Sequence, residues 1–284
     1  MVNYGRTDLA SEARTLRCRG GARELPGVAF RQEQLRGLSV TAVEILDEQG
    51  AQRLGKPIGH YYTLELPDRF ERGTALFPEA AAAIGELVAR CLSHKTPKLV
   101  LIAALGNPDI TPDALGSLAA SGILVTRHLK KQRPADFRFF TATALCRTGV
   151  LGTTGVESAA QVRMLCRELC PDCVIAIDAL AGAEFSRLCR TVQICDAGIA
   201  PGSGVGNDRE ALDRDALGVP VVAVGVPTVM DASLLSRDPA MAAMFVTPRS
   251  IDSDVRAAAR LIAYGIDLAL HRDLSVADID MLVG

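Results

Sequence analysis

The stretch Cys173–Leu180 reads CVIAIDAL, and it is the most strand-like apolar run in the chain. A second apolar run, Leu99–Leu105 (LVLIAAL), precedes it, and a third, Val219–Val226, follows it. Continuous apolar runs of this length are typical of strands buried on both faces of a parallel sheet. Helical patterns over Val156–Cys170 and Val255–His271 alternate with such runs. Together they predict an α/β fold, a mainly parallel sheet with helices on both faces.

Shorter patterns lie outside these runs. Ser39–Leu46 and His60–Leu66 alternate apolar and polar residues, which predicts half-buried strands in a small N-terminal β addition. Ile123–Leu129 and Phe139–Leu145 are also strand-like, and so is Thr191–Cys195. We therefore expect these three segments to add strands to the sheet.

The first 38 residues show little periodicity, and Met1–Arg6 is expected to be a mobile arm. No internal repeat, low-complexity tract or interdomain linker interrupts the remainder. A chain of 284 residues is long enough to bury one large core. We therefore predict one domain behind a short N-terminal arm.

Composition excludes some classes of partner. The formal net charge is -2, from 31 basic and 33 acidic residues, so no field of one sign favours nucleic acid or an anionic membrane. Trp is absent and aromatic residues make up 4%, too few for a stacking platform on single strands. The N-terminus lacks an apolar signal-type run, and no apolar run is long enough to span a bilayer. We expect a cytoplasmic protein.

The chain has eight cysteines. Cys170 and Cys173 form a C-x-x-C, but no second such pair or nearby histidine completes a zinc-ligand spacing. Because nothing suggests secretion, disulfides are not expected either. Small buried thiols are the favoured interpretation, and a metal or redox pair is the alternative.

Two aspartates follow the apolar runs. Asp113 comes just beyond Leu99–Leu105, and Asp178 ends the run Val174–Ile177. Catalytic groups in parallel sheets lie at the carboxyl ends of strands, so we expect both carboxylates on one rim. A close carboxylate pair suits peptide hydrolysis, because one ionised acid activates water while its protonated partner donates. The alternatives are structural: Asp113 can favour a helix N-terminus, and Asp178 can accept backbone hydrogen bonds.

Two further features are candidates for the site. Gly202-Ser203-Gly204 is a glycine-rich loop that either approaches a substrate or makes a tight turn, and it lacks the Lys of a P-loop. His128 is the one histidine in the α/β pattern. It is either a supporting catalytic group or a structural residue at a strand end.

Blocks distributed along the whole chain resemble the germination protease family of spore-forming bacteria. They are Arg6–Ala10 (RTDLA), Gly106-Asn107 with Thr111–Gly116 (TPDALG), Thr126–Leu129 (TRHL), Gly149–Gly152 with Thr154-Gly155, Ile175–Leu180 (IAIDAL), Gln193-Ile194, Pro201–Asn207 (PGSGVGN), and Gly225–Val229 with Asp231-Ala232. The blocks keep one order, and several are long and unusual.

The resemblance implies an endopeptidase that degrades small acid-soluble spore proteins during germination, in the forespore or spore core. It also implies an atypical aspartic peptidase without a cofactor or metal, with Asp113 and Asp178 as its essential acids. The implied fold is that of hydrogenase-maturation peptidases. Family members are zymogens, often tetrameric, that trim their own N-termini, so a homo-oligomer is expected.

A self-cleavage site follows from the same resemblance. Asp8-Leu9-Ala10-Ser11-Glu12 is similar to the substrate motif of the family, with the cut between Asp8 and Leu9. Residues 1–8 are therefore expected to be a propeptide-like arm, and residues 9–284 the peptidase domain. The chain departs from the family pattern in two ways: a segment between Asp231 and Val246 is shorter than expected, and Cys195 replaces an expected Ser.

Two other functions remain open from the residues alone. A metal-dependent peptidase would use Asp113, Asp178 and His128 as ligands. A non-catalytic protein would bind phosphate or a nucleotide at the loop from Gly202 to Asn207.

Overall fold

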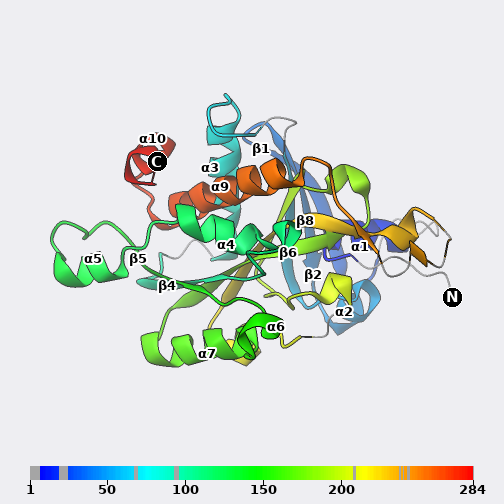
Figure 1. The fold of residues 1–284 in the computed structure, drawn as a ribbon, viewed down its shortest axis with the longest axis horizontal. Coiled ribbons are helices and arrows are strands. Elements are labelled where there is room, and N and C mark those ends of the chain that lie inside the picture. Colours follow the sequence, from blue (N-terminus) through cyan, green and yellow to red (C-terminus); the bar gives the residue numbers. More distant parts are fainter. Residues whose placement is uncertain are drawn as a thin grey trace.

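One mixed sheet organises the molecule (Figure 1). The computed structural model describes residues 7–18, 25–66, 70–92, 96–206, 209–236, 238, 240–241 and 244–283. Within them, eight strands run in the order β1-β2-β3-β7-β8-β6-β4-β5, and a ninth, β9, pairs with β8. The strands are β1 (Val28–Leu35), β2 (Leu38–Ile45), β3 (Gly59–Glu65), β4 (Leu99–Ala104), β5 (Ala142–Arg147), β6 (Cys173–Gly182), β7 (Thr191–Cys195), β8 (Val221–Asp231) and β9 (Phe245–Val246). The expected mobile arm Met1–Arg6 lies outside the described residues.

Four neighbouring strands, β5, β4, β6 and β8, are parallel. In β6, Ile175 and Ile177 belong to one buried cluster, whereas Val174 and Ala176 belong to another, because successive side chains point to opposite faces. This explains why the run is apolar without alternation. The predicted α/β class, with parallel strands and an N-terminal β addition, is confirmed.

Helices cover both faces of the parallel strands. In Figure 1, α3, α4 and α9 lie on one side of the sheet and α7 on the other. Because each face is buried, a charged side chain along these strands must lie at their ends or be paired. The helices are α1 (Ala10–Cys18), α2 (Glu48–Leu54), α3 (Phe77–Cys91), α4 (Leu115–Ala119), α5 (Arg127–Gln132), α6 (Leu151–Thr154), α7 (Ser158–Leu169), α8 (Arg214–Leu217), α9 (Ile251–Leu270) and α10 (Val276–Val283).

The other half of the sheet is antiparallel. Strands β1, β2 and β3 form a meander, and β7 then joins β3 to β8 with antiparallel pairing on both sides. Arg36 and Gly37 make the two-residue turn between β1 and β2, and both have positive φ, as a tight hairpin requires. Strand β1 and helix α1 were not predicted. β1 is an edge strand with largely exposed side chains, so its sequence carries no apolar alternation.

The predicted strand Ile123–Leu129 is wrong. Its second half belongs to helix α5, and the edge position beside β4 is taken by β5. Polar contacts decide this path: the Thr126 hydroxyl donates to the Thr141 carbonyl at 2.5 Å, and the Leu124 N–H donates to the buried Asp267 carboxylate. These contacts involve distant residues, so the local apolar pattern was misleading.

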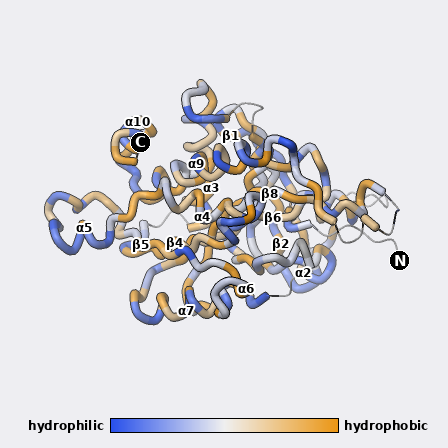
Figure 2. The backbone as a smooth tube through the Cα atoms, viewed as in Figure 1, coloured by the Kyte–Doolittle hydropathy of each residue, from blue (hydrophilic) through white to orange (hydrophobic). Residues whose placement is uncertain are grey.

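Hydropathy along the chain follows this architecture. Figure 2 shows the central strands as largely hydrophobic and α5 as largely hydrophilic. Among the described residues, no helix has the length and apolarity needed to cross a membrane.

Candidate active site

Asp113 and Asp178 line one cavity of about 440 Å³ at the carboxyl end of the parallel strands. Asp178 lies on β6, opposite Gly225 of β8. Asp113 ends a single 3-10 turn, Thr111–Asp113, in the segment that follows β4. Strands β4 and β6 are adjacent and parallel, so their carboxyl ends bring the two acids to the same rim.

The loop after β4 holds Asp113 in place. The Asn107 N–H donates to the Asp113 Oδ2 at 2.8 Å. Gly106 has a φ of 93°, and a Cβ there would lie 2.0 Å from the Asp113 carbonyl oxygen, so only glycine fits. Burial raises the pKa of Asp113, while the Asn107 hydrogen bond and the charge of Arg209 act in the opposite direction.

Asp178 is the more buried acid, at 4% exposure. Burial raises its pKa well above the usual range, and the neighbouring charge of Asp113 raises it further. Two carboxylates that repel each other retain one proton between them. Burial and the neighbouring charge therefore favour the protonated form of Asp178 more strongly than burial favours that of Asp113.

His128 does not join this pair. It is exposed on α5, which Figure 1 places at one extreme of the molecule, and it is not among the residues lining the cavity. Within the described ranges, no three His, Cys, Asp or Glu side chains come together as a metal-binding group. The structure thus does not assemble the ligand set Asp113, Asp178 and His128.

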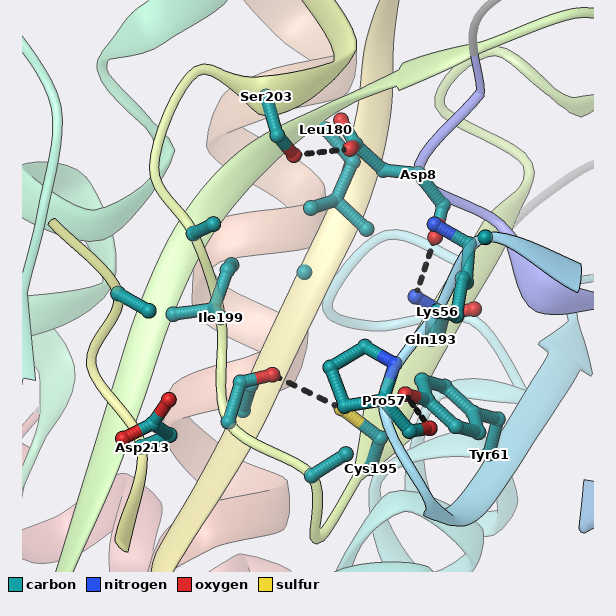
Figure 3. Close-up of a pocket in the computed structure, with 17 residues that line it drawn as sticks. Asp8, Lys56, Pro57, Tyr61, Leu180, Gln193, Cys195, Ile199, Ser203 and Asp213 are labelled. Carbon is teal, nitrogen blue, oxygen red and sulfur yellow. Dashed lines mark hydrogen bonds between the residues drawn. The ribbon is translucent and has the colours of Figure 1, made fainter. Parts of the chain in front are cut away.

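The N-terminal segment lies in the site. The Asp8 N–H donates to the Ala181 carbonyl at 2.9 Å, and the Ala181 N–H donates to the Asp8 Oδ2 at 2.8 Å. The Ser203 hydroxyl donates to the Asp8 Oδ1 at 2.8 Å (Figure 3). Leu9, on the other side of the predicted cleavage site, is fully buried. The residues just before helix α1 therefore lie against the end of β6, and both carboxylate oxygens of Asp8 accept hydrogen bonds.

The glycine-rich loop closes around this carboxylate. Gly202 has a φ of 73° and starts the 3-10 turn Ser203–Val205. A Cβ at Gly204 would lie 2.2 Å from the Asp8 Oδ2 and 2.6 Å from the Ala181 Cβ. The absence of a side chain at Gly204 is what lets the Asp8 carboxylate fit.

A second acidic side chain of the segment is also bound. Glu12 is 1% exposed, and its oxygens accept from the Ala183 N–H at 2.6 Å and the Glu184 N–H at 3.1 Å. The Arg187 Nε lies 3.8 Å from the same carboxylate. Burial raises the pKa of Glu12, while its hydrogen bonds, from Thr7 and the two amides, and the Arg187 charge act against this rise.

Sequence reasoning missed the residues that hold the peptide. Gln193 contacts the backbone of Asp8 and Ala10 through its carboxamide, and Thr63 donates a hydrogen bond to the Ser11 hydroxyl at 3.1 Å. Gln193 stood within a block that resembles the family, which was the available signal, but no role was assigned to it. The backbone amides of 181, 183 and 184 carry no signal in sequence at all.

Figure 3 shows a second cavity, of about 200 Å³. It shares Asp8 and Leu180 with the first. Gln193, Tyr61 and the Lys56 side chain line it. Burial lowers the pKa of Lys56, and the charge of Asp8 opposes this shift. Asp8 thus separates a cavity lined by the carboxylate pair from one lined by Gln193.

All eight cysteines are free thiols. Cys170, in the C-x-x-C, is exposed and ends α7 with a positive φ, whereas Cys173 is buried at the start of β6. Cys195 is buried, and burial raises its pKa to about 12. It donates a weak hydrogen bond to the Gly198 carbonyl at 3.4 Å, so it is an inert thiol in this environment.

Comparison with known proteins gives a family match over most of the chain. The family model described as germination protease matches residues 6–244. A germination protease of Caldanaerobacter subterraneus subsp. tengcongensis is 37% identical over 319 aligned positions, which cover 98% of this chain and 98% of that protein. One of Clostridium perfringens is 33% identical and covers 97% of this chain and 98% of its own length. Because 319 positions exceed the 284 residues of this chain, the first relative carries segments that this chain lacks.

Other comparisons cover less. A germination protease of Bacillus cytotoxicus is 38% identical over 82% of this chain and 65% of that protein. A solved nickel–iron hydrogenase maturation protease of Thermococcus kodakarensis has a TM-score of 0.35 and 17% identity, over 63% of this chain and 98% of that chain. On the match to the family model and the identity of relatives that span nearly its whole length, this chain belongs to the germination protease family and is a peptidase of that family.

Proposed function

We propose that the chain is an endopeptidase that activates water with Asp113 and Asp178 and that first cuts its own Asp8–Leu9 bond. One observation carries the proposal: Asp8 lines the same cavity as both acids. Its carboxylate and backbone are held by Ser203 and Ala181, as a bound substrate would be.

In the proposed reaction, Asp113 is ionised and Asp178, whose pKa is raised more, is protonated. Ionised Asp113 takes a proton from water, and the water oxygen forms a bond to the carbonyl carbon of Asp8. Asp178 gives its proton to the carbonyl oxygen. When the C–N bond breaks, the Leu9 nitrogen receives the proton held by Asp113, and one hydroxyl of the diol returns its proton to Asp178. The balance is one water consumed, one carboxyl group formed on Asp8 and one amine formed on Leu9.

The bound substrate assists the pair. The Asp8 carboxylate raises the pKa of Asp178, in addition to the effects of burial and Asp113. Because a third negative group makes ionisation of Asp178 less favourable, an acidic residue before the cut helps to keep the catalytic proton in place.

The test follows intact mass of the full-length protein over time at mildly acidic and neutral pH. Wild type loses residues 1–8, whereas Asp113→Asn and Asp178→Asn do not. Asp109→Asn is the matched control, because Asp109 is exposed on the same loop as Asp113. Equal processing of wild type and either dyad variant would refute the assignment. Chelator added to the wild type leaves the rate unchanged if no metal takes part.

The proposal extends to substrates and assembly. By relationship to germination proteases, the substrates are small acid-soluble spore proteins, cleaved in the forespore or spore core at motifs similar to Asp8–Glu12. The processed form starts their degradation during germination. A homo-oligomer is proposed as well, with no nucleic acid or membrane partner. Incubation with a purified spore protein, with mass analysis of the fragments, tests the substrate, and light scattering tests the assembly.

A further inference from the structure

Gln193 spans the bond that the proposed function breaks. Its Nε2 donates to the Asp8 carbonyl oxygen at 2.9 Å (Figure 3). Its Oε1 accepts from the Ala10 N–H at 2.8 Å. The carboxamide therefore contacts the backbone on both sides of Leu9. Rotating the carboxamide by 180° would place its oxygen against the Asp8 carbonyl oxygen and its NH₂ group against the Ala10 N–H. Only one orientation therefore satisfies both contacts.

The position of Gln193 is rigid. It is 7% exposed and lies on β7, paired with Thr63 of β3 on one side and with Gly225 of β8 on the other. An interior strand with partners on both sides fixes the backbone beneath the side chain. Rigid placement matters for catalysis, because a hydrogen-bond donor that must move or lose water during the reaction stabilises the transition state less.

The carboxamide and the carboxylate pair reach Asp8 from different cavities. Asp113 and Asp178 line the cavity of about 440 Å³, and Gln193 lines the adjoining one, while Asp8 lines both. A donor on the carbonyl oxygen and an attacking water from the other side is the arrangement that acyl transfer requires.

We propose that Gln193 holds the scissile peptide unit and donates to the carbonyl oxygen while negative charge develops on it, before Asp178 has protonated that oxygen; this inference rests on the proposed function. The contact with Ala10 sets the register of the peptide, and the contact with Asp8 stabilises the transition state that leads to the tetrahedral intermediate. Gln193 is thereby a substrate-contacting catalytic residue that composition and spacing did not reveal.

The experiment compares self-cleavage of Gln193→Glu, Gln193→Met and wild type by intact mass across a range of pH. Gln193→Glu keeps an acceptor for Ala10 but loses the donor to Asp8, and Gln193→Met loses both. Near neutral pH, each variant is expected to slow by about 100-fold or more, the usual effect of removing one such donor. At acidic pH, a protonated Glu donates again, so Gln193→Glu recovers part of the rate relative to wild type and Gln193→Met does not. Gln32→Glu, on the exposed strand β1, is the control and cleaves like wild type.

The outcomes separate the two proposals. If wild type cleaves and both Gln193 variants stay within about threefold of its rate, the role of Gln193 is wrong and the proposed function stands. If wild type does not cleave, or if it cleaves no faster than Asp113→Asn and Asp178→Asn, the proposed function fails and this inference falls with it. A second measurement covers loss of activity through misfolding: in folded Asp113→Asn protein, adding Gln193→Met is expected to speed hydrogen exchange at the Ala10 amide. Unchanged protection there would overturn the proposal.

Discussion

Asp8 and Ala181 exchange two hydrogen bonds: the Asp8 N–H donates to the Ala181 carbonyl, and the Ala181 N–H donates to the Asp8 carboxylate. The first bond contacts the backbone of Asp8, and the second contacts its charged side chain. The end of β6 thus recognises an acidic residue just before helix α1 through main-chain groups. Both contacts use main-chain groups of residue 181, so the recognition is carried by the fold.

Asp8→Asn is expected to slow self-cleavage by about 10- to 100-fold. The substitution removes the charge that accepts from Ala181 and Ser203, and charge-assisted bonds contribute about 1.5–3 kcal/mol each. Ser203→Ala removes one of those donors and has a smaller effect in the same direction. Intact mass gives the rates. Cleavage of Asp8→Asn at the wild-type rate would show that the acidic side chain is not recognised.

Glu12→Gln is expected to weaken docking of the segment and slow self-cleavage by about tenfold. The Ala183 and Glu184 amides then face a neutral acceptor, and Arg187 loses one of its charged partners, the carboxylate at 3.8 Å. Glu48→Gln, an exposed acid in the first turn of α2, is the matched control. A peptide competitor carrying Glu four residues after its cleavage site should inhibit better than the Gln version. Equal inhibition by both peptides would argue against the subsite.

Gly204→Ala is expected to abolish self-cleavage while leaving the fold intact. A Cβ at this position would meet both the Asp8 carboxylate and the Ala181 Cβ, at 2.2 and 2.6 Å, so the segment must leave the site. Gly152→Ala is the control, because no atom lies within 4 Å of the Cβ it would add. Circular dichroism checks the fold, and protease sensitivity of the N-terminus checks undocking. A docked and cleaved Gly204→Ala protein would contradict the geometry.

Asp178→Asn is expected to raise the melting temperature at neutral pH. Burial and Asp113 raise the pKa of Asp178 in the folded state above its unfolded value of about 3.9. The folded wild type therefore binds the proton more tightly, and it loses stability as pH rises from about 4 through the folded pKa. Asn resembles the protonated acid and escapes this loss, so the two proteins should converge near pH 4. Thermal melts across pH test this, with the exposed Asp273→Asn as control. An unchanged difference at every pH would contradict the linkage.

The parallel strands could be predicted from sequence because burial on both faces imposes a pattern on consecutive residues. The runs around Leu101 and Ile175 are apolar on both faces, and no other local structure explains them as well. The acids at the ends of these runs could also be singled out, since a carboxylate is costly within apolar surroundings. Strand β1 and the path of 123–129 could not be predicted, because β1 is exposed and the second segment is held by Thr141 and Asp267, far away in sequence.

Sequence by itself determined the α/β class, the family resemblance and the two acids, because each depends on local composition or on motifs read along the chain. Only the tertiary structure decided what those acids face. In the structure, Asp8 lines two cavities, and Gln193 hydrogen-bonds to the backbone of Asp8 and Ala10. His128 does not line the cavity of the two acids. The physical reason is that the recognition uses backbone amides of β6, the absence of a side chain at Gly204 and a glutamine on an interior strand. None of these becomes a binding group until distant segments pack against one another.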